Sequence, residues 1–314
     1  MDWLESRMFD KDFYNEASAK KLRWHPSWFG ADYFDEELVK AIKKFQKKYN
    51  LPADGLCGPM TYRRLCMARL IGDYLENLPR QFKKLNRKKN HIIHKGNKLP
   101  IEWEKVILWD DPGGLKINPG SYYDNSAKPE RKPTVFVNHW DVCLNSESCG
   151  RILNQRGISV HFCIDNDGTI YQLLDTQHGA WHCSSRIGNK ASIGIEISNA
   201  YYPKYQKWYE SHDFGTRPIL ENTEVHGKIL PPFTGFYPIQ LEALKSLWKA
   251  VHLAFDIPLE FPQNEDGTFC TTVHNPSIKG NFHGFNNHYN YTKGKIDCAG
   301  LDLPKMLEEV KNEV

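Results

Sequence analysis

The feature that most constrains the fold is a strand–turn–strand pattern at residues 160–174. Two apolar segments, 160–164 and 169–174, flank the turn sequence D-N-D-G at residues 165–168. Short apolar runs on either side of an Asp/Asn/Gly turn predict a β-hairpin. A hairpin of this kind needs further strands and a covering layer to be stable, so it predicts a larger sheet around it.

The remaining pattern from about residue 101 onward is mixed α and β. Further short strands are predicted at residues 134–138 and 191–197. An amphipathic helix is predicted at residues 238–255, with an apolar stripe that comprises Leu241, Leu244, Trp248 and Val251. Strands mixed with helices predict an α/β domain whose sheet is flanked by helices.

The first part of the chain predicts a small helical domain. Residues 35–49 have acids in the first turn, lysines in the last turn, and apolar side chains at helical spacing. A turn at residues 54–58 follows, and Pro59 suits the first position of a second helix that runs to about residue 70. We therefore expect a helical domain at residues 1–72.

Residues 73–100 are predicted to connect the two domains, and residues 101–314 to form the second domain. The connector contains the basic run K-K-L-N-R-K-K-N at residues 83–90. Such a run is either solvated surface or an attraction for an anionic polymer. The formal net charge of the chain is only +3, which does not indicate a nucleic-acid partner.

Targeting and redox signals are weak in this sequence. The N-terminal segment M-D-W-L-E is already mixed, and no run approaches the roughly 20 apolar residues of a membrane span. We expect no signal peptide and no membrane partner, and therefore synthesis in a cytoplasm. The eight cysteines include no C-x-x-C pair, so we expect reduced, buried thiols and no zinc ribbon.

Potential metal ligands lie in two distant parts of the chain. His139 follows the apolar strand at residues 135–137, and the C-terminal region supplies further candidates: His274, His283, His288, Asp297 and Cys298. Two imidazoles and one anionic group can hold zinc and leave a fourth position open for water. Glu196 alternates with Ile195 and Ile197 on the strand between these segments. Zinc beside a carboxylate predicts hydrolysis of an amide.

Taken in order, these motifs resemble the zinc-dependent N-acetylmuramoyl-L-alanine amidases. The resemblance covers residues 130–305: the strand ending in His139, S-V-H-F-C-I-D-N-D-G-T-I-Y-Q-L, A-W-H, N-x-x-S-I-G-I-E-I, and K-I-D-C-A-G-L-D. It implies the fold shared with peptidoglycan-recognition proteins, a mixed central sheet flanked by helices. Residues 20–70, with the turn L-P-x-D-G-x-x-G-P, resemble a three-helix peptidoglycan-binding domain. Residues 24–29 depart from that pattern, so a cap that only packs on the main domain remains the alternative.

The resemblance implies a set of zinc ligands. His139 and His288 are the expected imidazole ligands, with His274 and His283 as competitors for the second place. Asp297 is the expected third ligand because it stands two residues after Lys295. Cys298 remains the alternative, since a thiolate also binds zinc strongly.

The resemblance also implies catalytic and substrate-binding residues. Glu196 is expected to act as the general base and Lys295 to stabilise the oxyanion. Trp181 and His182 are expected to line the substrate groove, the alternative being plain core packing. Val160 occupies the place of a tyrosine that related phage enzymes carry. The catalytic role of that tyrosine is therefore absent, and proton transfer is expected to depend on Glu196.

The expected function is hydrolysis of the bond between N-acetylmuramic acid and L-alanine in bacterial peptidoglycan, with Zn²⁺ as the cofactor. A wall-binding domain joined to an amidase, without a signal peptide, favours a phage endolysin that acts on the cell wall. Two alternatives stay open. One is a module that binds peptidoglycan without cutting it, and the other is a hydrolase of a different peptidoglycan amide.

Overall fold

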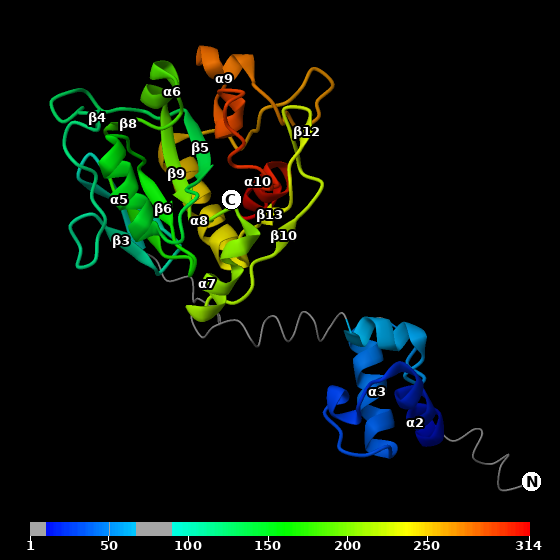
Figure 1. Cartoon of the computed structure of the whole chain (residues 1–314). Coiled ribbons are helices and arrows are strands. Elements are labelled where there is room, and N and C mark those ends of the chain that lie inside the picture. The colour runs from blue at the N-terminus through cyan, green and yellow to red at the C-terminus, as the bar shows by residue number, and fades with distance from the viewer. Residues whose placement is uncertain (1–10, 50, 67–89) are drawn as a thin grey trace, which may run out of the picture. The chain divides into compact units, whose positions relative to one another are not determined.

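The computed structural model describes residues 11–49, 51–66 and 90–314, and the chain divides into two compact units at residues 1–78 and 79–314 (Figure 1). Most of the predicted basic connector, residues 73–89, lies outside the described residues. No helix in the described ranges is both long enough and apolar enough to span a membrane.

The small unit contains α2 (Lys11–Leu22), a 3₁₀ turn η1 (Pro26–Phe29), α3 (Glu36–Lys48) and a helical segment at residues 59–66. The predicted helix is confirmed as α3, and the Asp35 carboxylate caps it by accepting a hydrogen bond from the Leu38 N–H at 3.1 Å. The sequence did not reveal α2, because its apolar side chains do not repeat along one face. The three helical segments share one apolar core, which includes Trp24, Leu38, Ile42 and Leu65.

The large unit is built on a six-stranded mixed sheet. Its order is β14 (Gly284–Asn287), β5 (Val135–Trp140), β9 (Ser192–Ile197), β6 (Phe162–Ile164), β7 (Ile170–Gln172) and β3 (Val106–Leu108). β6 and β7 pair antiparallel, which confirms the predicted hairpin, and the other pairs are parallel. The predicted strands at residues 134–138 and 191–197 are present as β5 and β9.

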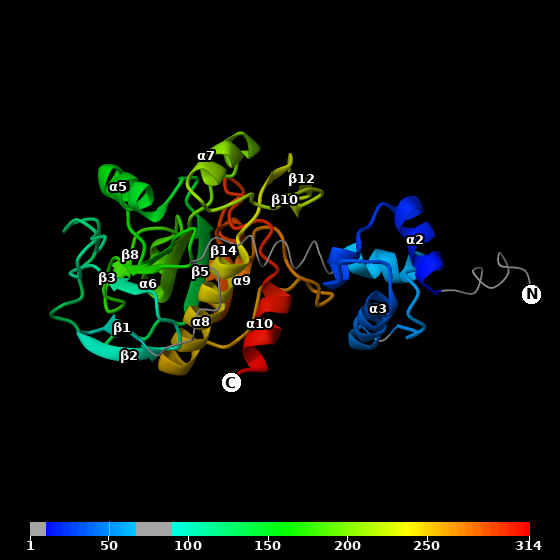
Figure 2. The ribbon, with the colours of Figure 1, turned by 90° about the horizontal axis from the view of Figure 1, so that it is seen from below.

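Helices cover both faces of this sheet (Figure 2). The predicted helix is α8 (Pro238–Phe255), and it lies on one face together with α10 (Leu303–Lys311). On the opposite face lies α5 (Ser146–Arg156). Ile193, Ile195 and Ile197 of β9 join the core beneath α8. Because side chains alternate along a strand, Gly194 and Glu196 face the other side, the side of α5.

Smaller elements complete the large unit. They are the strand pairs β1–β2 (Asn90–His94 and Asn97–Ile101), β4–β8 (Tyr122–Tyr123 and Gly179–Ala180), β10–β13 (Ile219–Leu220 and Phe233–Thr234) and β11–β12 (Glu224–Val225 and Lys228–Ile229), and the short helices α6 (Arg186–Ala191), η3 (Pro203–Tyr205), α7 (Gln206–Ser211), α9 (Asn275–Lys279) and η4 (His288–Asn290).

Residues 90–100, which the sequence placed in the connector, form most of the β1–β2 hairpin. Two features favour a hairpin over a linker. Ile92 and Ile101 are buried in the main core, and Lys95 and Gly96 both have positive φ, as a tight hairpin turn requires. The polar and basic residues around these positions mask that signal in the sequence.

Candidate metal centre and cleft

The parallel pairing of two strands brings His139 and His288 together. Asn138 of β5 pairs with Asn287 of β14. The residue that follows each of them, His139 and His288, therefore lies at the same edge of the sheet. Asp297 reaches the same place from the following loop, where its carbonyl accepts a hydrogen bond from the Tyr289 N–H at 2.9 Å. Residues 158 positions apart in the chain thus meet at one point.

The three side chains converge with their ligand atoms almost equidistant. Nδ1 of His139 lies 2.9 Å from Nδ1 of His288 and 3.0 Å from Oδ2 of Asp297, and the third distance is 2.9 Å. All three residues are buried. Within the described ranges they form the one group of three such side chains close enough to share a metal ion. A tetrahedral zinc site needs ligand atoms about 3.3 Å apart, a few tenths of an ångström more than here, so small side-chain shifts would let this donor set hold the ion.

The electrostatics of the cluster suit a cation. Burial, with His288 nearby, lowers the pKa of His139 to about 4, so its imidazole is neutral near pH 7. Burial opposes ionisation of Asp297, but hydrogen bonds from His139 and His288 outweigh it and lower the pKa of this carboxyl well below its usual range. A neutral imidazole at His139 and a carboxylate at Asp297 are the protonation states that metal binding requires.

The competing ligands lie elsewhere. The Cys298 side chain is fully buried in the apolar core beneath α8, and burial raises the pKa of its thiol well above the usual value. Nδ1 of His274 lies 2.7 Å from the Ser277 hydroxyl at the start of α9, and His283 is exposed. None of the three belongs to the cluster formed by His139, His288 and Asp297.

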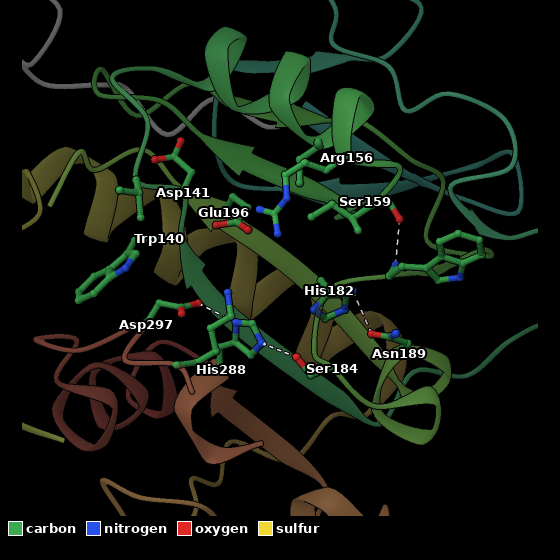
Figure 3. A pocket seen from close by; sticks show the side chains of 15 residues that line it. Trp140, Asp141, Arg156, Ser159, His182, Ser184, Asn189, Glu196, His288 and Asp297 are labelled. Atoms are coloured by element: carbon green, nitrogen blue, oxygen red, sulfur yellow. Dashed lines mark hydrogen bonds and ion pairs between the residues drawn. The ribbon is translucent and has the colours of Figure 1, made fainter. Parts of the chain in front are cut away.

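A cleft of about 360 Å³ opens beside the cluster (Figure 3). Its lining includes His288, Asp297, Glu196 and Lys295. Oε2 of Glu196 is buried and has no hydrogen-bond partner. Burial, reinforced by the neighbouring carboxylates Asp297 and Asp141, raises the pKa of Glu196 well above its usual value, and Lys295 opposes this only in part. An unpaired carboxyl with a raised pKa in a cleft is suited to proton transfer.

Trp181 and His182 both line the cleft, but their surroundings differ. Trp181 packs edge-on against Tyr123, and its indole Nε1 has no protein partner. His182 instead places Nδ1 2.9 Å from Nε2 of His139. The geometry therefore joins His182 to the group of His139, His288 and Asp297, a contact that the sequence did not indicate.

Other cleft residues were also missed from the sequence. Asp141 accepts hydrogen bonds from the Asn199 and Cys143 N–H groups at 3.0 and 2.8 Å, and burial raises its pKa to about 7. Its position two residues beyond His139, directly after the end of β5, was the available signal. Arg156, at the end of α5, lines the cleft beyond Glu196, and only the fold brings it there (Figure 3).

Comparison with known families gives one match in each unit. Residues 129–277 match the family model described as N-acetylmuramoyl-L-alanine amidase, and residues 29–65 match a putative peptidoglycan binding domain. The first match contains His139 and Glu196 but ends before His288 and Asp297. A comparison with curated proteins gives no match.

Three solved structures illustrate the likeness at low sequence identity. The amidase LysC from Clostridium intestinale URNW is 15% identical, with 66% of this chain and 98% of that chain covered and a TM-score of 0.38. The catalytic domain of XlyA is 17% identical, with coverage of 67% and 98% and a TM-score of 0.35. AmpDh3 from Pseudomonas aeruginosa, solved in complex with an anhydromuramic pentapeptide, is 20% identical, with coverage of 63% and 66% and a TM-score of 0.35.

Proposed function

We propose that this chain, whose residues 129–277 match the N-acetylmuramoyl-L-alanine amidase family model, hydrolyses the amide between the lactyl group of N-acetylmuramic acid and L-alanine of the stem peptide. The observation that carries the proposal is the convergence of His139, His288 and Asp297 beside the unpaired carboxyl of Glu196 in one cleft. Two imidazoles and a carboxylate match the donors that zinc prefers.

We assign Nδ1 of His139, Nδ1 of His288 and Oδ2 of Asp297 as the zinc ligands, because these atoms already lie within 3.0 Å of one another. Zinc would supply Lewis-acid polarisation of the substrate carbonyl and would lower the pKa of water. The residues around the centre then have to hold the substrate amide, move one proton and stabilise the negative charge that develops on the carbonyl oxygen.

Glu196 is the proposed general base. Its raised pKa brings proton uptake closer to neutral pH, where a general base is most effective. After accepting the proton of the attacking water at its carboxylate, Glu196 can deliver it to the departing L-alanine amine. Lys295 lines the same cleft, and its ammonium group would stabilise the oxyanion.

The small unit is proposed to bind the cell wall. Its match to a putative peptidoglycan binding domain supports this role. A tethered binder raises the effective concentration of the hydrolase on an insoluble polymer without taking part in the chemistry. The combination favours a bacteriolytic enzyme of the phage endolysin type.

Digestion of purified peptidoglycan followed by mass spectrometry tests the proposal. We expect fragments in which L-alanine gains a free amino terminus and the lactyl group of muramic acid gains a free carboxylate. Glu196→Gln, which removes the base and keeps the shape, is the matched control and should give almost none. Cleavage between other stem-peptide residues would indicate a different amidase, and wall binding without any fragments would indicate a recognition module.

A further inference from the structure

The His182 imidazole is held between a proposed metal ligand and a serine. Its Nδ1 lies 2.9 Å from Nε2 of His139, and its Nε2 lies 3.0 Å from the Ser192 hydroxyl oxygen. The rings of His139 and His182 meet edge to face, with centroids 5.1 Å apart. Both nitrogens of His182 therefore have protein partners, which leaves neither of them free for a substrate.

The direction of these hydrogen bonds follows from the metal site. A neutral imidazole carries one proton, so His139 with Nδ1 on a metal has its proton on Nε2. That N–H donates to Nδ1 of His182, which must then carry its own proton on Nε2 and donate it to the Ser192 oxygen. With a metal bound, this arrangement of protons directs the lone pair of His139 Nδ1 toward the cluster.

The His182 ring packs directly against the backbone of β9 at Gly194. A Cβ at Gly194 would lie 2.6–2.7 Å from three atoms of the His182 imidazole, closer than real contacts allow. Glycine is needed here for space. The backbone N–H groups of His182 and Cys183 also donate to Oδ1 of Asn189, at 3.0 and 2.9 Å, which fixes the segment that carries the ring.

We infer that His182 is a positioning residue for His139: seated on Gly194 and held by Ser192, it fixes the tautomer and orientation in which His139 binds the metal. This inference rests on the proposed function, because it takes the cluster as a metal site. It replaces the expectation that His182 contacts substrate. Groups that hydrogen-bond a metal-binding histidine typically contribute 10- to 100-fold in metal affinity.

The test is zinc affinity of the full-length chain, measured by competition with a chromophoric chelator. We expect His182→Ala to weaken zinc binding about 10- to 100-fold. His182→Gln, whose amide oxygen can accept the His139 proton, should recover part of that loss. Ser192→Ala should also weaken zinc binding, but less than His182→Ala does. It therefore tests the same inference if His182→Ala does not fold.

Gly194→Ala tests the packing of the His182 ring against β9, because the added Cβ would displace the ring. We expect it to weaken zinc binding as His182→Ala does, although it removes no polar atom. Gly150→Ala is the matched control, since the nearest atoms to a Cβ there belong to Leu115 and Leu173 at 3.6–3.8 Å, which is ordinary contact. Its zinc affinity should equal that of the wild type.

Two results separate failure of this inference from failure of the proposed function. If the wild type binds zinc and His182→Ala and Ser192→Ala bind it equally well, His182 does not position His139 and the inference is overturned alone. A rise in KM for soluble muropeptides in those variants would then make His182 a substrate contact. If the wild type binds no zinc, the proposed metal site and the inference fall together.

Discussion

At the scale of single residues, the adjacent pair Asp297 and Cys298 shows what sequence could and could not decide. Both can bind zinc, and the spacing from Lys295 favoured Asp297 through resemblance alone. The structure places the carboxylate of Asp297 against two imidazoles and the thiol of Cys298 in the apolar core. A sequence contains no distances, so only the fold distinguishes the surroundings of these two side chains.

Asp297→Ala should therefore release zinc, whereas Cys298→Ala should keep it and lose only core packing, on the order of 1–3 kcal/mol of stability. X-ray absorption at the zinc edge of the wild type should show nitrogen and oxygen at about 2.0–2.2 Å. A sulfur shell at about 2.3 Å that disappears in Cys298→Ala would move the ligand one residue along.

Glu196→Gln should retain zinc and lose about 10²- to 10⁴-fold in turnover, as removal of a general base does. The pH profile provides a second readout. Because burial raises the pKa of Glu196 above its ordinary 4.5, and the base must be ionised, kcat/KM of the wild type should fall on acidification at a pH above 4.5. Near-native turnover in the variant, or an unchanged acidic limb, would remove Glu196 from the mechanism.

At the scale of elements, strands and helices with a clear periodicity were predictable, and irregular ones were not. The hairpin β6–β7 and the helices α3 and α8 follow directly from apolar spacing. Helix α2 and the β1–β2 hairpin were not predicted from the sequence because their apolar residues are few or interrupted by charged residues. The pairing of β14 with β5, on which the site depends, is a contact across more than 140 residues that no local pattern specifies.

A buried histidine directly before β6, His161, should make the stability of the large unit depend on pH. His161 accepts the Gly194 N–H at Nδ1, at 3.0 Å, and donates from Nε2 to the His178 carbonyl, at 3.1 Å. Burial, with Arg131 nearby, lowers its pKa to about 3, so the folded state keeps it neutral. The unfolded chain binds this proton below about pH 6.5, so stability should fall as pH drops from about 6.5 toward 3.

Each pH unit in that window should remove up to about 1.4 kcal/mol of stability through His161. Denaturant unfolding of the wild type and of His161→Gln at several pH values measures this slope. The variant lacks the titrating group and should lose less stability on acidification. Equal slopes for both proteins would show that His161 is not the group responsible.

At the scale of the whole molecule, two units are proposed to divide targeting from chemistry. Removal of residues 1–72 should leave hydrolysis of small soluble muropeptides nearly unchanged and reduce the rate on intact walls, because a tethered binder acts only through local concentration. Rates of the full and shortened chains on the two substrates provide the comparison. A shortened chain that is equally fast on walls would make the small unit a packing cap.

The central claim is that His139, His288 and Asp297 form the zinc centre of an amidase, and removal and return of the metal tests it most directly. The full-length chain is stripped with a chelator and supplied with zinc, and release of L-alanine amino termini from purified peptidoglycan is measured at each stage. We expect about one zinc per chain, loss of release on stripping, recovery with zinc, and no recovery in His139→Ala. Undiminished release from the stripped protein, or recovery in His139→Ala, would contradict the account.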